Sequence, residues 1–349
     1  MSATLAAGVA VGVAVVLART TRDRRASPLT GEERRLGLQP GEPPLDGLQR
    51  MALGQIDIAL EQLQRASGMN AATAVHETRK ALKRLRALLR LLERELGAST
   101  YAREDAAVRD IARRLSGARD AQVMLDTLDA LIERHPRKLA RRKGVRRLRR
   151  ALLRDRERME RQALGEGAAL EQALAQLRDL RGRVAAWRAP ERDATKLVDR
   201  GLRDLYAQGR KGFRRAYRKQ GKDVHAMHRW RKRVKDLRYA AEMLERRPRA
   251  QEKRRGASAR LRRLAERADV LAEILGEDHD LAMLAERVRA EAKPHSHRRK
   301  KPQRVGRATR KTLLKLIARR RLKLQARALR EGAHLYRRGA KRFARRLRR

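Results

Sequence analysis

The sequence contains no cysteine and few aromatic residues, and each shortage argues against a class of protein. Without cysteine there is no disulfide framework, no thiolate nucleophile and no cysteine metal site, which is consistent with a reducing compartment. Phe, Trp and Tyr make up only 3% of the 349 residues. Proteins that stack the bases of single-stranded nucleic acid need aromatic platforms, so this composition argues against such a protein.

Acidic residues are also scarce relative to basic ones. The chain has 91 Lys plus Arg but only 41 Asp plus Glu, which gives a formal net charge of +50. Such an imbalance is self-repelling in a compact state, and a partner with many negative charges would relieve the repulsion. We therefore expect a polyanionic partner.

Proline is scarce too, and leucine, alanine and charged residues dominate, which favours helices. No segment shows the alternating pattern of a strand. We predict an all-α protein. The predicted helices span residues 45–66, 76–96, 102–116, 121–134, 137–163, 168–188, 194–219, 224–246, 257–275, 280–292 and 304–347, the last with breaks.

The first 43 residues differ from the rest, and we predict an apolar segment followed by a linker at 1–43. Residues 3–18 carry no charge, and arginines follow them. In a secretory signal the cations would precede the apolar run, so a signal is not expected. Two interpretations remain open: a membrane tether that leaves the body in the cytoplasm, or a loosely ordered extension. The body is expected to be cytoplasmic in both.

Two segments far apart in the chain repeat one motif. "HETRKALKRLR" occupies residues 76–86, and "HRWRKRVKDLR" occupies residues 228–238. A second element follows each copy, "LSGARDAQVM" at 115–124 and "LGEDHDLAML" at 275–284. The body therefore contains two repeats, each of which we predict to be an antiparallel four-helix bundle. The predicted ranges are 44–349 for the body, 44–189 for the first repeat and 190–349 for the second.

The two copies share one histidine and four cations in register, and these residues form a stripe along each motif helix. The stripes are His76, Arg79, Lys80, Lys83 and Arg86, and His228, Arg231, Lys232, Lys235 and Arg238. At 100° per residue they lie within about 120° of the helix surface. A solvated face would alternate charge signs, whereas cations one turn apart suit a linear polyanion with phosphate oxygens that arginine can grip. A bound polyanion would favour the protonated form of both histidines, so we expect them to make its affinity pH-dependent. The residues predicted to face the core are Val75, Leu82, Leu85, Leu89 and Leu92, with Trp230, Val234, Leu237, Ala241 and Leu244.

These motifs, with "GAHLYRRGAKRF" near the C-terminus, resemble the CHAD domain, the conserved-histidine α-helical domain. The resemblance covers about residues 45–349. It implies two four-helix bundles, related by a pseudo-twofold axis, around a basic groove or pore that binds inorganic polyphosphate, and association with polyphosphate granules. The residues that it assigns to the site are His76, Arg79, Lys80, Lys83, Arg86, His228, Arg231, Lys232, Lys235 and Arg238.

The helix predicted at 194–219 adds Arg203, Arg210 and Arg214 on one face, whereas its counterpart at 45–66 is nearly free of cations. We therefore add these three arginines to the candidate site. The second repeat is expected to hold more of the ligand.

No catalytic site, metal site or cofactor is expected. The adjacent His279 and Asp280 suggest a metal phosphohydrolase, but His279 aligns with Arg119, which cannot bind a metal. Asp280 aligns with Asp120, which we interpret as a helix N-cap or an ion-pair partner. The chain also lacks a phosphate-binding G-x-x-x-x-G-K-[ST] loop. Relatives often carry a triphosphate-tunnel domain, and the nearest approach to its motif, "ERELG" at 93–97, lacks the lysine.

Two alternatives stay open beside non-catalytic polyphosphate binding. The net charge also suits a protein that binds the backbone of DNA or RNA. A scaffold that sits on polyphosphate granules or on an anionic membrane is compatible with the main interpretation. The sequence makes no prediction of the oligomeric state.

Overall fold

The computed structural model describes residues 37–38, 42–66, 71–115, 117–164, 168–187, 194–245, 255–291 and 305–348. The chain divides into two compact units, Met1–Leu36 and Gly37–Arg349, and the second contains every described residue. The apolar segment expected at 3–18 lies outside the described residues, as does most of the linker expected before residue 44.

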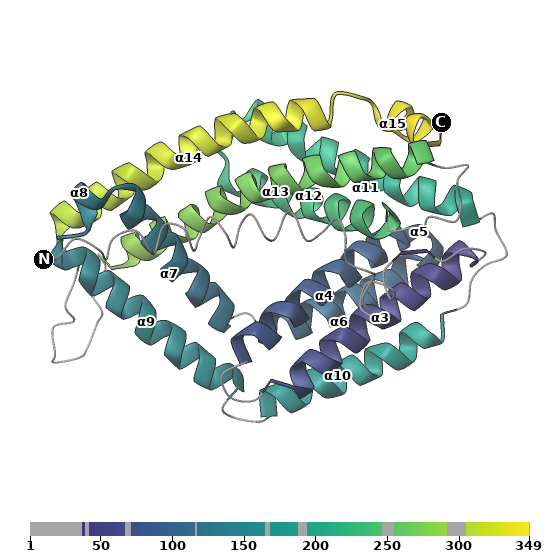
Figure 1. The fold of residues 1–349 in the computed structure, drawn as a ribbon, viewed down its shortest axis with the longest axis horizontal. Coiled ribbons are helices and arrows are strands. Elements are labelled where there is room, and N and C mark those ends of the chain that lie inside the picture. The colour runs from purple at the N-terminus through teal and green to yellow at the C-terminus, as the bar shows by residue number, and fades with distance from the viewer. Residues whose placement is uncertain are drawn as a thin grey trace, which may run out of the picture. The chain divides into compact units, whose positions relative to one another are not determined.

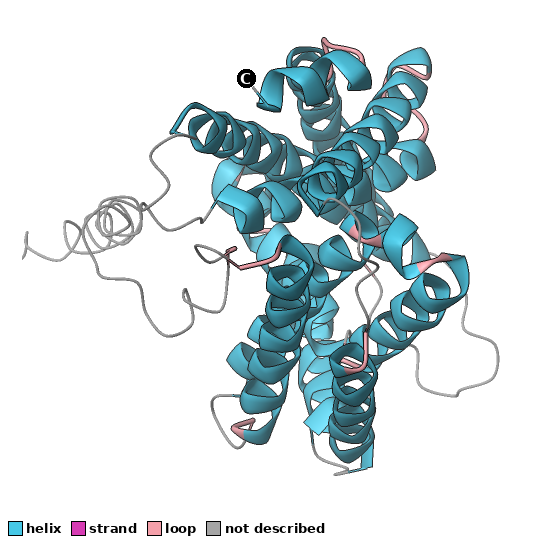
Figure 2. Cartoon of the chain, turned by 90° about the vertical axis from the view of Figure 1, so that its right-hand side faces the viewer, coloured by secondary structure: helices cyan, strands magenta, loops and turns pink. Residues whose placement is uncertain are grey.

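The described residues form thirteen helices and no strand, which confirms the all-α prediction (Figures 1 and 2). The helices from the first half of the chain are α3 (Pro44–Gln64), α4 (Ala71–Leu91), α5 (Glu93–Leu96), α6 (Ala98–Arg114), α7 (Gly117–Arg134), α8 (Pro136–Leu139), α9 (Lys143–Leu164) and α10 (Ala168–Ala185). Those from the second half are α11 (Ala194–Arg218), α12 (Val224–Glu245), α13 (Arg255–Ala290), α14 (Arg307–Leu335) and α15 (Ala340–Arg348).

Several predicted boundaries are wrong. The helix expected at 76–96 is divided into α4 and α5, and the helix expected at 137–163 is divided into α8 and α9. We expected separate helices at 257–275 and 280–292, but α13 runs through this region without a break. A single helical glycine such as Gly276 costs only about 1 kcal/mol. Buried leucines on both sides of it, Leu275 and Leu281, continue the apolar face and outweigh that cost. Asp280 therefore lies inside a helix and is not an N-cap.

The helices pack into groups that meet at α4 and α12. In the first half, α3, α4, α6 and α10 pack on one another, while α7 packs on α9. In the second half, α11, α12, α13, α14 and α15 pack together. The two motif helices, α4 and α12, contact each other directly, and α7 packs on α13. Helices from the two halves of the chain thus share one interior.

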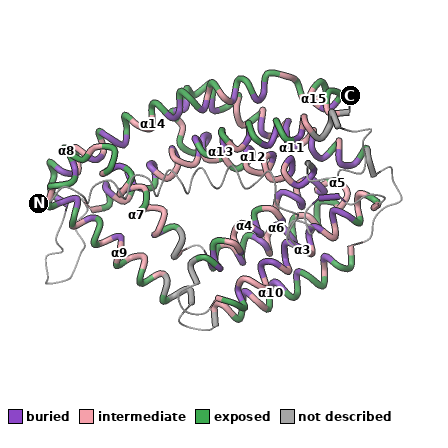
Figure 3. The backbone as a smooth tube through the Cα atoms, viewed as in Figure 1, coloured by how far each residue is buried: buried purple, intermediate pink, exposed green. Residues whose placement is uncertain are grey.

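The apolar faces of the motif helices lie in the core, as predicted. All ten residues expected to face inward are at most 2% exposed, and Figure 3 shows buried positions recurring along both helices. On α4 the buried face is wider than predicted and includes Ala81, Leu88 and Leu91. This width arises because α4 packs on α3, α6 and α12 at the same time.

Candidate functional site

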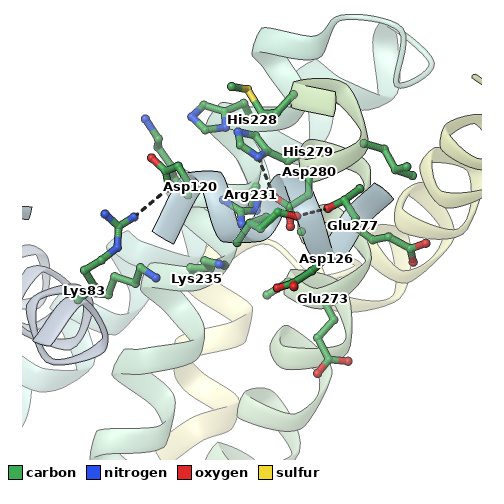
Figure 4. A pocket seen from close by; sticks show the side chains of 18 of the residues that line it. Lys83, Asp120, Asp126, His228, Arg231, Lys235, Glu273, Glu277, His279 and Asp280 are labelled. Atoms are coloured by element: carbon green, nitrogen blue, oxygen red, sulfur yellow. Dashed lines mark hydrogen bonds and ion pairs between the residues drawn. The ribbon is translucent and has the colours of Figure 1, made fainter. Parts of the chain in front are cut away.

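A cleft of about 970 Å³ lies where α4, α7, α12 and α13 come together, with one residue contributed by α14 (Figure 4). Nine of the thirteen residues predicted for the site line this cleft. They are His76, Arg79, Lys83 and Arg86 from α4, and His228, Arg231, Lys232, Lys235 and Arg238 from α12. The fold thus brings together two stripes that are far apart in the sequence.

The other four predicted residues do not line the cleft. Lys80 forms an ion pair with Glu77 at 3.1 Å. On α11, Arg203 pairs with its neighbour Asp204, and the exposed Arg214 is not among the residues that line the cleft. Arg210 donates a 3.2 Å hydrogen bond from Nε to the carbonyl oxygen of Tyr336 at the end of α14, which is a structural role.

A second wall of the cleft is acidic, and the sequence did not predict it. Carboxylates from α7 and α13 line this wall: Asp120, Asp126, Glu273, Glu277 and Asp280. Glu277 holds Arg320 at 2.6 Å, so part of the wall is already neutralised by a cation. The alignment of Asp120 with Asp280 was the one available signal, but it did not show that the two residues face the stripes.

On α4, Arg79 is bound to residues near the end of α6. It donates to the carbonyl oxygens of Ala112 and Leu115 at 3.4 and 3.3 Å, where α6 ends. It also pairs with Asp120 at 3.4 Å, which confirms the ion-pair role for Asp120. A cation at a helix C-terminus satisfies free carbonyl groups and the helix dipole. Arg86 likewise pairs with Asp105 on α6 at 2.9 Å.

On α12, the motif histidine His228 packs against a second histidine. The rings of His228 and His279 stack with centroids 4.5 Å apart, and His279 Nδ1 lies 3.1 Å from Asp280 Oδ1. Burial, followed by the neighbouring His279, Lys232 and Arg231, lowers the pKa of His228 to about 4. His228 is therefore neutral at physiological pH.

The pKa values of three cations of the second stripe, Arg231, Lys232 and Lys235, are also lowered, chiefly by burial. Burial, reinforced by Arg231 and Lys83, lowers the pKa of the Lys235 amine to about 7, although Asp280 opposes the shift. Burial likewise lowers the pKa of Arg231. Arg231 Nε and His228 Nδ1 are buried without a hydrogen-bond partner. Unpaired buried polar atoms are uncommon in folded proteins, and here they lie on residues that line a cleft.

Neither a metal cluster nor a membrane-spanning helix is found among the described residues. No group of three His, Cys, Asp or Glu side chains there is arranged to hold a metal ion. None of the helices in this part of the chain is long and apolar enough to cross a bilayer.

The comparison with protein families agrees with this architecture. The CHAD domain family matches residues 54–289, more than half of the chain, and this range contains both stripes. The chain therefore belongs to the CHAD domain family. A comparison with curated proteins found no match.

Proposed function

We propose that this protein binds inorganic polyphosphate in the cleft between α4 and α12 and does not catalyse a reaction on it. The observation that carries the proposal is the convergence of the two stripes. Side chains from both motif helices line one cleft, and cations spaced along a helix suit a chain of phosphates. The unpaired Nε of Arg231 is a donor that phosphate oxygens would satisfy.

The cleft suits a thin polyanion better than a nucleic acid. Tyr239 is the one Phe, Trp or Tyr among the described lining residues, so a platform for stacked bases is lacking there. The acidic residues of α7 and α13 face the same space as the stripes. A broad duplex backbone would meet these carboxylates, whereas a single phosphate chain can follow the cationic wall. Binding of DNA or RNA remains the competing proposal because of the net charge.

The order of helix contacts supports two repeats, 44–189 and 190–349, related by a pseudo-twofold axis through the α4–α12 contact. The pairing of α3 with α4 is matched by that of α11 with α12. The pairing of α7 with α9 is matched by that of α13 with α14, and α10 on α3 is matched by α15 on α11. Under this proposal α13 is the counterpart of α6 and α7 together.

We further propose a cytoplasmic protein that associates with polyphosphate granules through the same cleft. Residues 3–18 would add a weak membrane tether if they insert into a bilayer. Both proposals concern location, and microscopy of the full chain and of a chain without residues 3–18 tests them separately.

Competition at equal phosphate concentration tests the function. Labelled duplex DNA is bound to the purified protein and titrated with long-chain polyphosphate or with unlabelled DNA. We expect polyphosphate to displace the label at a much lower phosphate concentration than DNA does, with no release of inorganic phosphate. If unlabelled DNA is the better competitor, nucleic-acid binding replaces the proposal, and steady phosphate release would show an enzyme.

A further inference from the structure

Lys235 occupies an unusual position in the cleft. It lies on α12, and Figure 4 shows its amine in the same region as Lys83 of α4. The charged groups that act on it are Arg231 and Arg238 from α12, Lys83 from α4 and Asp280 from α13. The helix α11 also packs on α12 but contributes none of the described residues that line the cleft. Lys235 therefore lines the same cleft as three cations and the carboxylate of Asp280.

The surroundings of Lys235 favour the neutral form of its amine, which is the nucleophilic form. An ordinary lysine has a pKa near 10.4, so only about one amine in a thousand is neutral at pH 7.4. Burial and the adjacent cations bring the pKa of Lys235 to about 7, which leaves more than half of its amines neutral at that pH. A neutral, desolvated lysine is the form that enzymes use for attack on carbonyl carbon.

The same cations provide a place for a phosphate group. Arg231, with its unpaired Nε, can grip phosphate oxygens, and Lys83 adds a point charge, whereas Arg238 is held by Glu242 and Asp269. A small molecule whose phosphate binds there would hold its other end next to the Lys235 amine. Holding two reactants together raises the rate of reaction by increasing their effective concentration.

We infer that Lys235 is a site of acylation by acyl phosphates, small molecules in which a carbonyl carbon is joined to a phosphate oxygen. The amine nitrogen attacks the carbonyl carbon and a C–N bond forms. The C–O bond to phosphate breaks, and its electron pair leaves with inorganic phosphate. The proton released from nitrogen passes to the departing phosphate or to water. The product is an amide, and no oxidant or reductant is required.

Acylation would change the cleft for other ligands. It removes the capacity of Lys235 for positive charge and places an uncharged group among the cations. Polyphosphate affinity would then fall, so the supply of acyl phosphates would control binding. This consequence rests on the proposed function, whereas the acylation itself needs only one phosphate group to be held.

The test is acetylation of the full-length protein by acetyl phosphate at pH 7.5, followed over time by mass spectrometry. Cleavage before Asp223 and Asp236 releases one peptide that contains both Lys232 and Lys235, so the two are compared within one molecule. We expect Lys235 to be acetylated at least about tenfold faster than Lys232 or the exposed Lys311. Its rate should level off just above pH 7, because the amine of Lys235 is largely neutral above its pKa. Equal rates at the three lysines would overturn the inference.

A second reagent tests the role of the phosphate. An acetyl ester of N-hydroxysuccinimide carries no phosphate, so the preference for Lys235 should shrink with it, and pyrophosphate should protect Lys235 from acetyl phosphate alone. An equal preference with both reagents would contradict the phosphate anchor. Fast acetylation of Lys235 in a protein that fails to bind polyphosphate would refute the proposed function but not this site. Polyphosphate binding without fast acetylation of Lys235 would refute this site but not the proposed function.

Discussion

The two stripes share one motif but lie in different environments. Lys83 on α4 is exposed, while its counterpart Lys235 on α12 is largely buried with a pKa lowered to about 7. His76 is exposed, whereas His228 is half-buried against the ring of His279. At these two pairs of positions, α4 thus presents its side chains at the surface of the cleft, and α12 holds them partly buried.

The cause of the difference lies in the helices that follow each motif. In the first repeat α6 ends at Arg114, so the carbonyl groups near its end are free to accept hydrogen bonds from Arg79. In the second repeat α13 continues through the equivalent position, and helical hydrogen bonds use the corresponding carbonyl groups. Arg231 therefore lacks the partners of Arg79, and its Nε stays unpaired. The end of α6 thus gives Arg79 a structural role. The continuous helix α13 leaves the Nε of Arg231 without such a partner.

The largest effect is expected where the two motif helices, α4 and α12, meet. Arg90 on α4 forms an ion pair with Asp236 on α12 at 3.2 Å, with side chains only 10% and 14% exposed. Asp236→Ala would leave the half-buried Arg233 without its carboxylate and Arg90 with Asp105 alone, 4.0 Å away. Breaking such a buried pair costs about 3–5 kcal/mol. Chemical denaturation should show that loss of unfolding free energy.

The matched control for this variant removes an exposed pair from the first repeat. Asp110 and Arg113 lie 3.3 Å apart with most of their side chains in water. Asp110→Ala should cost less than about 1 kcal/mol. Similar losses for the two variants would show that the Arg90–Asp236 pair does not stabilise the contact between the repeats.

Separate substitutions of Arg79 and Arg231 by glutamine test the comparison of the two arginines directly. Arg79→Gln removes bonds to the end of α6 and should cost about 1–3 kcal/mol of unfolding free energy. Arg231→Gln removes a buried cation without a hydrogen bond at Nε, so stability should stay equal or rise. Polyphosphate affinity should fall about tenfold or more in Arg231→Gln because a charged hydrogen bond to phosphate is lost. The idea fails if Arg231→Gln is the less stable variant and Arg79→Gln the weaker binder.

The two halves of the described chain also differ in their aromatic packing. Tyr206, Phe213, Trp230 and Tyr336 form one cluster among the helices of the second repeat. A Cβ added at Gly332 would lie 2.6 Å from atoms of Phe213 and Trp230. Gly332→Ala should therefore cost about 1–3 kcal/mol.

A glycine of the first repeat supplies the opposite expectation. A Cβ at Gly182 in α10 would meet no atom within 4 Å. Gly182→Ala should leave stability unchanged or raise it by up to about 1 kcal/mol, because alanine favours a helix. Thermal unfolding of both variants measures the contrast, and a shift of the same sign in both would refute the packing argument.

A smaller effect concerns pH. Lys235 carries its charge below its pKa of about 7 and loses it above, so tripolyphosphate affinity should fall several-fold between pH 6 and pH 8.5. Lys235→Arg, which stays charged, should flatten this dependence, whereas Lys83→Arg should not. Tripolyphosphate itself also titrates in this pH range, but it does so equally with the natural protein and with each variant. Comparing the slopes of their affinities against pH therefore removes this contribution. His228 has a pKa of about 4 and should contribute little in this range, so His228→Gln should keep the slope of the natural protein.

The sequence predicted the helices and their buried faces because apolar residues recur with the helical period. It could not predict the wide buried face of α4, which depends on α12 packing across it. From the sequence we assigned the pH dependence of binding to the histidines. The lowered pKa of Lys235 could not be predicted, because it depends on residues from three helices. The acidic wall was missed for the same reason: Asp126 and Glu273 face the stripes only after α7 and α13 have packed together. Lys80 satisfied the spacing of the stripe but turns to Glu77.

The central claim is that both stripes bind one phosphate chain in one cleft, and a paired charge swap tests it most directly. Lys83→Glu with Lys232→Glu changes one exposed lining residue on each motif helix. Lys80→Glu with Arg229→Glu changes one residue on each of the same helices outside the cleft lining and removes the same four charge units from +50. Both variants must first show the helical circular dichroism of the natural protein. Titration calorimetry with long-chain polyphosphate should then show a loss of about a hundredfold or more for the cleft variant and less than about threefold for the control, since carboxylates repel the chain only where it binds. Equal losses would contradict the claim and leave binding to the net charge alone.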